Sequence, residues 1–335
     1  MNRIQADIQT IISYKDLFEP LRHATVLITG ATGLIGSMLI RTLAEAQKAY
    51  DLDLKLVGQI RNIEKARTVL AGYLDAVTLS LSDDVSCDYI IHTVSPTASK
   101  YFIEHPVETI RTSVGSTLSI LEVAQKNAAS IVYLSSMEQY GVPYEPGQTM
   151  TEDKTGIIDH LSIRSSYSES KRLCECLCAS YASEYGVDVK IARLAQTFGA
   201  GVSQDDHRMP MQFARAVIEE KDIVLHTEGN SLSNFVYLTD AITGILTLLL
   251  KGEAGQAYNI CNDRETRAVR EVAELVCRET AEGRIQMCVQ KKDNMGFAPE
   301  VKMYLNSDKL RALGWTPTVE MKEAYRRLVA YLRGE

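Results

Sequence analysis

The sequence predicts an α/β fold in which a doubly wound parallel sheet carries a smaller C-terminal lobe. Short apolar runs alternate along the chain with longer segments of helical period, and most of these runs are apolar at consecutive positions. Strands of a parallel sheet show this pattern because helices bury both of its faces. The alternation becomes irregular after about residue 195, where we expect the second lobe to begin.

The elements follow in order along the 335 residues. Residues 1–20 are expected to form an additional amphipathic helix, and residues 107–127 a long helix between two strands. The expected strands are ATVLITG (24–30), LKLVGQI (54–60), AVTLSL (76–81), YIIHTVS (89–95), IVYLSS (131–136) and VKIARL (189–194).

A glycine-rich loop follows the first strand in the stretch TGATGLIGS, residues 29–37. Gly30 permits a tight turn, Gly33 permits close approach of a ligand to the backbone, and Gly36 lets the following helix pack on the strand. Such a loop presents backbone N–H groups and a helix N-terminus to a pyrophosphate, which predicts dinucleotide binding. The expected cofactor contacts of the loop are these glycines with Thr32, Leu34 and Ile35.

The loop makes the sheet a Rossmann-type, dinucleotide-binding domain. We assign it residues 21–195, with a return segment near 233–250 that begins at SNFVYLTD. Residues 196–232 and 251–335 are then the smaller substrate-binding lobe.

The second strand leaves the choice of cofactor open. An acidic residue usually ends this strand and binds the adenosine ribose, but Ile60 and Arg61 stand there. Arg61 is a candidate for binding the 2′-phosphate of NADP; the alternatives are stacking on adenine and a plain surface residue.

Three further polar residues stand in an order that suggests chemistry. Ser136 ends the fifth strand, at the sheet edge where the cofactor is expected, and Tyr167 and Lys171 follow on a predicted helix. Residues four apart on a helix lie on one face, so the tyrosine and the lysine are neighbours.

The stretches TGATGLIG, HTVSP, SSMEQYG and YSESK together resemble the extended short-chain dehydrogenase/reductase family. The resemblance extends over nearly all of the chain beyond residue 24 and is to the NAD-dependent epimerase/dehydratase type, which acts on NDP-sugars. The pattern is most similar to that of UDP-glucuronate decarboxylases.

The resemblance implies a role for each of these residues. Tyr167 is the general base for a sugar hydroxyl, Ser136 orients the reacting oxygen, and Lys171 binds the nicotinamide ribose. Because a free tyrosine has a pKa near ~10, the Lys171 cation is expected to lower it toward the working range. Glu138, two residues after the serine, matches an acid that dehydratases and decarboxylases carry and plain 4-epimerases usually lack; the alternative is a solvated carboxylate.

Four positions depart from the family pattern and put the substrate in question. Ser233 stands where relatives carry an arginine that pairs with the nucleotide diphosphate, Gln196 replaces an asparagine, and Met137 and Ile60 are the other two. Arg208 is a candidate for the missing charge. The expected substrate contacts are Ser95, Gln196 and Arg208.

Composition limits the possible partners. The formal net charge of −7 argues against a nucleic-acid partner, and no apolar run is long enough to span a bilayer. The seven cysteines lack the spacing of a metal site, so no metal is expected. The expected location is the cytoplasm, and the resemblance implies a homodimer that forms through the helix of Tyr167.

The leading hypothesis is an enzyme that oxidises C4 of a nucleotide-sugar with a bound, recycled nicotinamide cofactor, for which we expect NAD, with NADP possible. The sequence leaves epimerisation, dehydration and decarboxylation open. One alternative is an NADP-linked ketone reductase, which Arg61 would favour. Another is a non-catalytic dinucleotide sensor, although a sensor has no need of Ser136, Tyr167 and Lys171 together.

Overall fold

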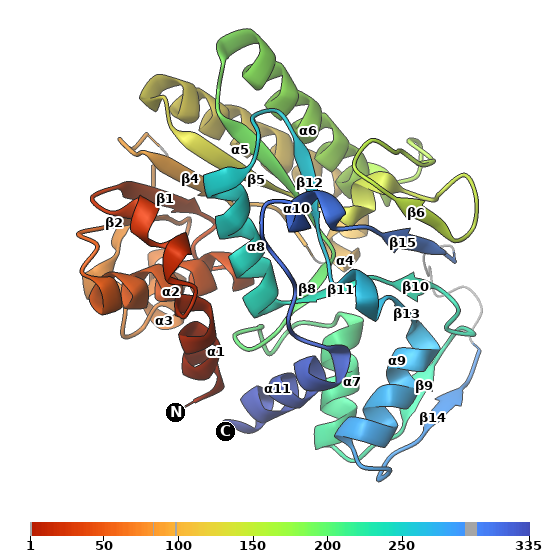
Figure 1. Cartoon of the computed structure of the whole chain (residues 1–335). Coiled ribbons are helices and arrows are strands. Elements are labelled where there is room, and N and C mark those ends of the chain that lie inside the picture. The colour runs from red at the N-terminus through yellow and green to blue at the C-terminus, as the bar shows by residue number, and fades with distance from the viewer. Residues whose placement is uncertain (1, 83, 98, 292–299) are drawn as a thin grey trace.

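A seven-stranded parallel sheet forms the centre of the molecule (Figure 1). The structure is a computed structural model that describes residues 2–82, 84–97, 99–291 and 300–335. The strand order is β12-β7-β5-β4-β1-β2-β3, which is a doubly wound order and confirms the predicted fold class. The strands are β1 (Thr25–Thr29), β2 (Lys55–Gln59), β3 (Thr78–Ser80), β4 (Tyr89–His92), β5 (Ser130–Ser136), β7 (Val189–Leu194) and β12 (Ala257–Ile260).

Helices cover both faces of the sheet, as the continuous apolar strands predict. Because successive side chains of a strand point to opposite faces, Val26 and Ile28 of β1 join one apolar cluster and Leu27 joins another. The first cluster includes α2 (Leu34–Tyr50) and α8 (Leu238–Lys251), and the second includes α5 (Pro106–Asn127) and α6 (Ser165–Tyr185). Two shorter helices, α3 (Ile63–Val69) and α4 (Ser99–Glu104), connect strands.

The smaller lobe has its own apolar core, at the lower right of Figure 1. Its helices are α7 (Met209–Ile218), α9 (Val269–Leu275) and α11 (Met321–Arg333), and a π-helical segment, Val276–Thr280, continues α9. Four two-stranded pairings connect the lobe and its border with the sheet domain. They are β8 (Gln196–Phe198) with β11 (Phe235–Tyr237), β9 (Ile223–Leu225) with β14 (Met287–Val289), β10 (Leu232–Ser233) with β13 (Arg267–Ala268), and β6 (Gln148–Met150) with β15 (Met303–Leu305). The short helix α10 (Asp308–Arg311) follows β15.

One expected boundary needs correction. We assigned residues 251–335 to the lobe, but β12 lies within that range and pairs with β7 in the large sheet. The chain therefore returns to the sheet for longer than the segment 233–250. The strand AYNI is short and follows an acidic, glycine-containing turn, so its sequence gives little sign of a seventh strand.

The N-terminal helix links the two parts of the molecule. The helix α1 (Arg3–Ile12) is followed by two 3₁₀ turns, Lys15–Leu17 and Glu19–Leu21, so the helix is shorter than the expected 20 residues. It packs against α2 and α8 on the sheet side and against α11 of the lobe. The carboxylate of Asp7 is fully buried there, with Arg3 at 2.8 Å and Arg327 of α11 at 3.3 Å.

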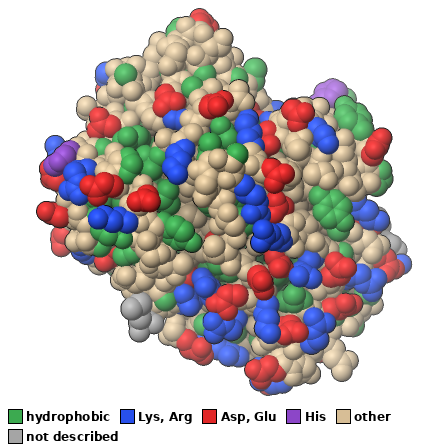
Figure 2. All heavy atoms as spheres, viewed as in Figure 1, with side chains coloured by type: hydrophobic (Ala, Val, Ile, Leu, Met, Phe, Trp, Pro, Cys, Tyr) green, Lys and Arg blue, Asp and Glu red, His purple; other side chains and the backbone are tan. Residues whose placement is uncertain are grey.

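Surface charge is mixed on the face shown in Figure 2, where basic and acidic side chains are interspersed. Within the described residues, no helix is both long and apolar enough to cross a membrane. The same part of the chain contains no group of three or more His, Cys, Asp or Glu side chains placed to hold a metal ion.

Candidate active site

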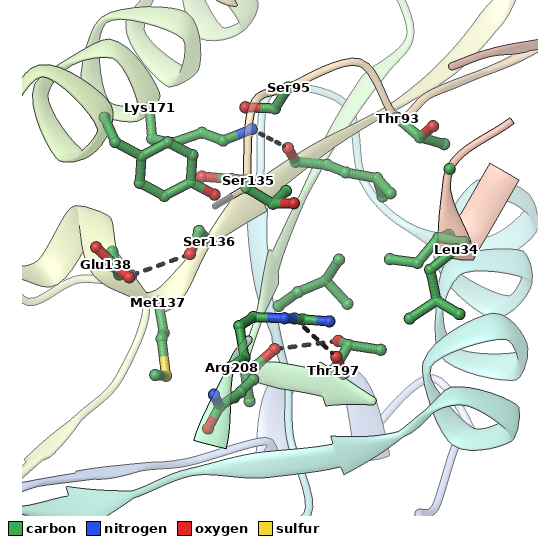
Figure 3. A pocket seen from close by; sticks show the side chains of 18 of the residues that line it. Leu34, Thr93, Ser95, Ser135, Ser136, Met137, Glu138, Lys171, Thr197 and Arg208 are labelled. Atoms are coloured by element: carbon green, nitrogen blue, oxygen red, sulfur yellow. Dashed lines mark hydrogen bonds between the residues drawn. The ribbon is translucent and has the colours of Figure 1, made fainter. Parts of the chain in front are cut away.

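A cavity of about 510 Å³ lies between the carboxyl ends of the sheet strands and the lobe (Figure 3). Ligands of open α/β sheets bind at this edge. The cavity brings together residues predicted separately from the sequence: Gly33, Leu34, Ile35, Ser95, Ser136, Glu138, Tyr167, Lys171, Gln196 and Arg208. Thr93, Thr97, Phe102, Leu134, Ser135, Met137, Leu194, Ala195, Thr197, His207 and Met209 complete its lining.

The glycine loop has the geometry that its sequence predicts. Gly30 follows β1 with a φ of +65°, in the left-handed region that glycine favours. Gly33 is the N-cap of α2, and its N–H donates to the Gly30 carbonyl at 2.9 Å. A Cβ on Gly36 would lie 2.4 Å from the Gly30 oxygen, so only glycine lets the helix start so close to the strand. The N-terminus of α2 therefore faces the cavity directly.

The end of β2 offers no carboxylate to a ribose. Ile60 is buried in the apolar core, whereas Arg61 is exposed. Within the described residues, no hydrogen bond or ion pair holds the Arg61 guanidinium. Neither residue lines the cavity around Tyr167.

Tyr167 and Lys171 lie one turn apart on α6, as predicted. The helix has no proline or glycine and ends at Gly186, which has a left-handed φ of +68°. Both side chains are buried, and the Tyr167 ring stacks on Phe102 with centroids 4.3 Å apart. The Lys171 Nζ lies 5.7 Å from the Tyr167 ring centroid and donates to the Leu134 carbonyl at 2.7 Å.

The effect expected of Lys171 on the tyrosine is not found in the protein chain alone. Burial, and secondly the charge of Glu138, raise the pKa of Tyr167 above its ordinary value. Hydrogen bonds with Ser136 and Ser95 and the charge of Arg208 act in the opposite direction but do not prevail. Burial also lowers the pKa of Lys171 to about 8. Desolvation thus acts against both charged forms, and a further positive charge in the cavity would be needed to favour the phenolate.

Ser136 and Glu138 form a compact unit at the end of β5. Ser136 is the N-cap of the 3₁₀ turn Met137–Tyr140, and its Oγ accepts the Glu138 N–H at 3.2 Å (Figure 3). Glu138 is half-buried in the cavity wall. Burial raises the pKa of its carboxyl, although the charge of Arg164 opposes this. A carboxyl of this kind can exchange protons closer to neutral pH than a surface glutamate can.

The lobe supplies the opposite wall. Arg208 precedes α7, and its guanidinium pairs with Asp206 at 2.7 Å and donates to the Thr197 carbonyl at 3.1 Å. Gln196 stands at the start of β8, within the lining. Ser233, on strand β10, which precedes the β8 partner β11 in the chain, does not line the cavity.

Some residues of the site had no signal in the sequence. Phe102 lies on α4, and only the three-dimensional fold brings it against Tyr167. Ser135 donates to buried Glu175 at 2.5 Å, and Glu175 pairs with Arg193 at 2.7 Å. This buried network fixes the end of β5 beside Ser136, and the sequence gives no sign that the two charged residues meet.

The fold and the glycine-loop crevice define an α/β protein of the dinucleotide-binding class. The model of the NAD dependent epimerase/dehydratase family matches residues 26–261. The chain therefore belongs to that family, as its motifs predict. It is an enzyme family whose members act on NDP-sugars.

Individual relatives agree with this assignment. UDP-glucuronic acid decarboxylase 3 of Arabidopsis thaliana is 30% identical over 304 residues, covering 89% of this chain and 86% of the relative. UDP-glucuronic acid decarboxylase 1 of Danio rerio is 25% identical over 339 residues, and the match covers 97% of this chain and 78% of the relative. Among solved structures, UDP-glucuronic acid 4-epimerase of Bacillus cereus, in complex with UDP-glucuronic acid and NAD, has a TM-score of 0.76 at 19% identity. That match covers 92% of this chain and 99% of the epimerase.

Proposed function

We propose that the protein oxidises C4 of a nucleotide-activated sugar and restores the hydride in the same catalytic cycle. The observation that carries the proposal is the convergence of Ser136, Tyr167, Lys171 and Glu138 on one cavity beside the glycine loop. The family description supports NAD as the cofactor. The bound cofactor supplies the hydride acceptor and, in its oxidised form, a positive charge.

The glycine loop and Lys171 are the residues that hold this cofactor. The N-terminus of α2 binds its pyrophosphate through backbone N–H groups, and Lys171 reaches the nicotinamide ribose. A positive charge near Tyr167 lowers the pKa that burial has raised, because it favours the phenolate. The unfavourable burial of Tyr167 therefore makes its ionisation depend on an occupied cofactor site.

Each remaining side chain then has one task. Ser136 donates a hydrogen bond to the oxygen on C4, and the Tyr167 phenolate takes the proton from that hydroxyl. The hydrogen on C4 leaves as a hydride, taking the electron pair of the C4–H bond, and C4 becomes a ketone. Tyr167 later returns the proton when the hydride returns to C4.

Decarboxylation of an NDP-uronic acid is the form of this cycle that we prefer. After oxidation, the C6 carboxylate is β to the C4 ketone, which accepts the electron pair of the C5–C6 bond when carbon dioxide leaves. We assign to Glu138, in its protonated form, the delivery of the proton that C5 takes up after carbon dioxide leaves. The names of the relatives with 25–30% identity support this choice.

A panel of NDP-sugars and NDP-uronic acids, read by mass, tests the proposal. Loss of about 44 mass units indicates decarboxylation, loss of about 18 indicates dehydration, and conversion without a mass change indicates epimerisation. We expect loss of carbon dioxide from an NDP-uronic acid without net consumption of cofactor. Failure to convert any member of the panel would contradict the proposal.

A one-way NADP-linked ketone reductase is the second candidate. This candidate is favoured by the absence of an acidic residue at Ile60 and by the exposed Arg61, whose guanidinium has no hydrogen bond or ion pair within the described residues. An arginine at this place can bind a 2′-phosphate. Consumption of one NADPH for each ketone reduced, with no conversion of NDP-sugars, would support it.

We further propose that the protein forms a homodimer through α5 and α6. Val107, Ile110 and Leu118 of α5 and Leu173 of α6 are 36–60% exposed. A second copy of the chain would cover these apolar side chains as a four-helix contact. Light scattering after size exclusion should give twice the chain mass of 37.2 kDa; the mass of a single chain would contradict the dimer.

A further inference from the structure

A nucleotide-sugar brings a diphosphate with two negative charges, and the lobe wall must bind them. Arg208 is the arginine that lines the cavity, but Asp206 already neutralises it. Both Asp206 carboxylate oxygens contact its guanidinium, at 2.7–3.2 Å. One paired arginine is a weak site for a diphosphate, since the ligand must compete with a carboxylate of the protein.

A second arginine, Arg267, lies outside the cavity lining, on a strand pair that the chain connects to this wall. Gln196 of the lining is in register with Phe235, and its N–H donates to the Asn234 carbonyl at 3.0 Å. The preceding strand β10 pairs with β13 in antiparallel fashion, and Ser233 stands directly opposite Arg267. Residues that are directly opposite in an antiparallel pair share one face, with Cβ atoms about 4.5–5.5 Å apart.

The Arg267 guanidinium is held at one point only. Its Nε donates to Glu265 at 3.1 Å, and within the described residues its two Nη groups donate no hydrogen bond. The Arg267 side chain is 38% exposed, whereas that of Glu265 is 12% exposed. Ser233 is too short to cover the guanidinium, so within the described residues the two Nη groups remain for an anion. Two free Nη groups have the fork geometry that binds phosphate oxygens in pairs.

We propose that Arg267 binds the diphosphate of the substrate from the lobe side, and that Glu265 holds the arginine in position and weakens that binding. The inference rests on the proposed function, because it assumes a nucleotide-sugar substrate. It assigns Arg267 to substrate binding and gives it no part in the chemistry at C4.

Calorimetric titration of the full-length, NAD-saturated protein with UDP, dTDP, CDP and GDP tests the assignment. With the nucleotide that binds most tightly, Arg267→Ala should weaken binding at least tenfold, about 1.4 kcal/mol. Glu265→Gln should tighten binding, because it removes the competing charge and keeps the shape of the side chain. Arg264→Ala is the matched control, since Arg264 is an exposed arginine three residues earlier on the same segment, and it should change binding less than twofold.

The outcomes separate this inference from the proposed function. If a nucleotide binds the wild type and Arg267→Ala binds it equally well, the assignment is wrong and the proposed function stands. If Arg267→Ala and Glu265→Gln weaken binding alike, the pair only supports the fold of the lobe, and the assignment also fails. If none of the four nucleotides binds the wild type, both the assignment and the proposed function fail. Turnover provides a second readout: Arg267→Ala should raise KM and leave kcat within about twofold.

Discussion

Replacing Glu138 with glutamine separates the two half-reactions of the proposed cycle. Glutamine has nearly the same shape, and the backbone N–H of residue 138 can still donate to the Ser136 Oγ, so the end of β5 should keep its geometry. The substitution removes only the ionisable group from the cavity wall. Because the Glu138 charge raises the pKa of Tyr167, its removal favours the phenolate and should not slow the oxidation of C4.

The step after oxidation should slow strongly. General acid–base assistance is worth roughly 10²–10⁴-fold, or about 2.7–5.5 kcal/mol at 1.36 kcal/mol for each factor of ten. A loss of this size makes the second step limiting, so the reduced cofactor should accumulate during turnover. Stopped-flow absorbance near 340 nm, roughly where dihydronicotinamides absorb, measures it directly.

The dependence on pH gives a second test of the same residue. Burial raises the pKa of Glu138, so the wild type should keep the protonated carboxyl that serves C5, and with it kcat, up to a higher pH than an ordinary glutamate would allow. The fall of kcat as the pH rises through this pKa should be absent from the variant. Glu169→Gln, at a half-buried position on α6 outside the cavity lining, is the control and should behave as the wild type does. Full turnover of Glu138→Gln without accumulated reduced cofactor would refute the role of Glu138 and favour a plain epimerase.

Three further predictions follow from the structure. Tyr167→Phe should abolish turnover and leave calorimetric cofactor binding nearly unchanged, since it removes only the proton acceptor; a near-normal rate would exclude Tyr167 as the base. NAD should bind more tightly than NADP, and NADP binding at least tenfold tighter, about 1.4 kcal/mol, would favour the reductase and assign Arg61 to the 2′-phosphate. Asp7→Ala should lower the free energy of unfolding by about 1–3 kcal/mol, because it leaves Arg3 and the Tyr237 hydroxyl without their buried carboxylate, whereas Arg327 keeps its ion pair with Glu323. Urea denaturation measures this change, and a loss below about 1 kcal/mol would show that the cluster is not a significant link between α1 and α11.

The sheet domain could be predicted because its signals are local. A run such as IVYLSS is apolar at consecutive positions, and both faces of β5 are buried under helices. The glycine loop was equally clear from its spacing, and the structure shows that Gly30 and Gly36 each meet a steric condition that only glycine satisfies. For Tyr167 and Lys171, the helical spacing alone places both side chains on one face.

The lobe and the charge state of the site could not be predicted in this way. The lobe is made of two- and three-residue strands whose partners lie far away in the sequence, as when β10 pairs with β13. No periodic pattern shows that Ser233 lies opposite Arg267. The raised pKa of Tyr167 depends on how completely neighbouring elements bury the hydroxyl, which the spacing to Lys171 does not reveal.

The fate of a deuterium label at C4 tests the recycled hydride most directly. The substrate is the NDP-uronic acid that the enzyme converts, labelled with deuterium at C4 and present in large excess over the protein. If the hydride leaves C4 and returns within one cycle, the decarboxylated product should keep the label at C4. The reaction should then proceed without added cofactor. Product that lacks the label, or turnover that stops when an equivalent of added cofactor is consumed, would contradict the proposed cycle.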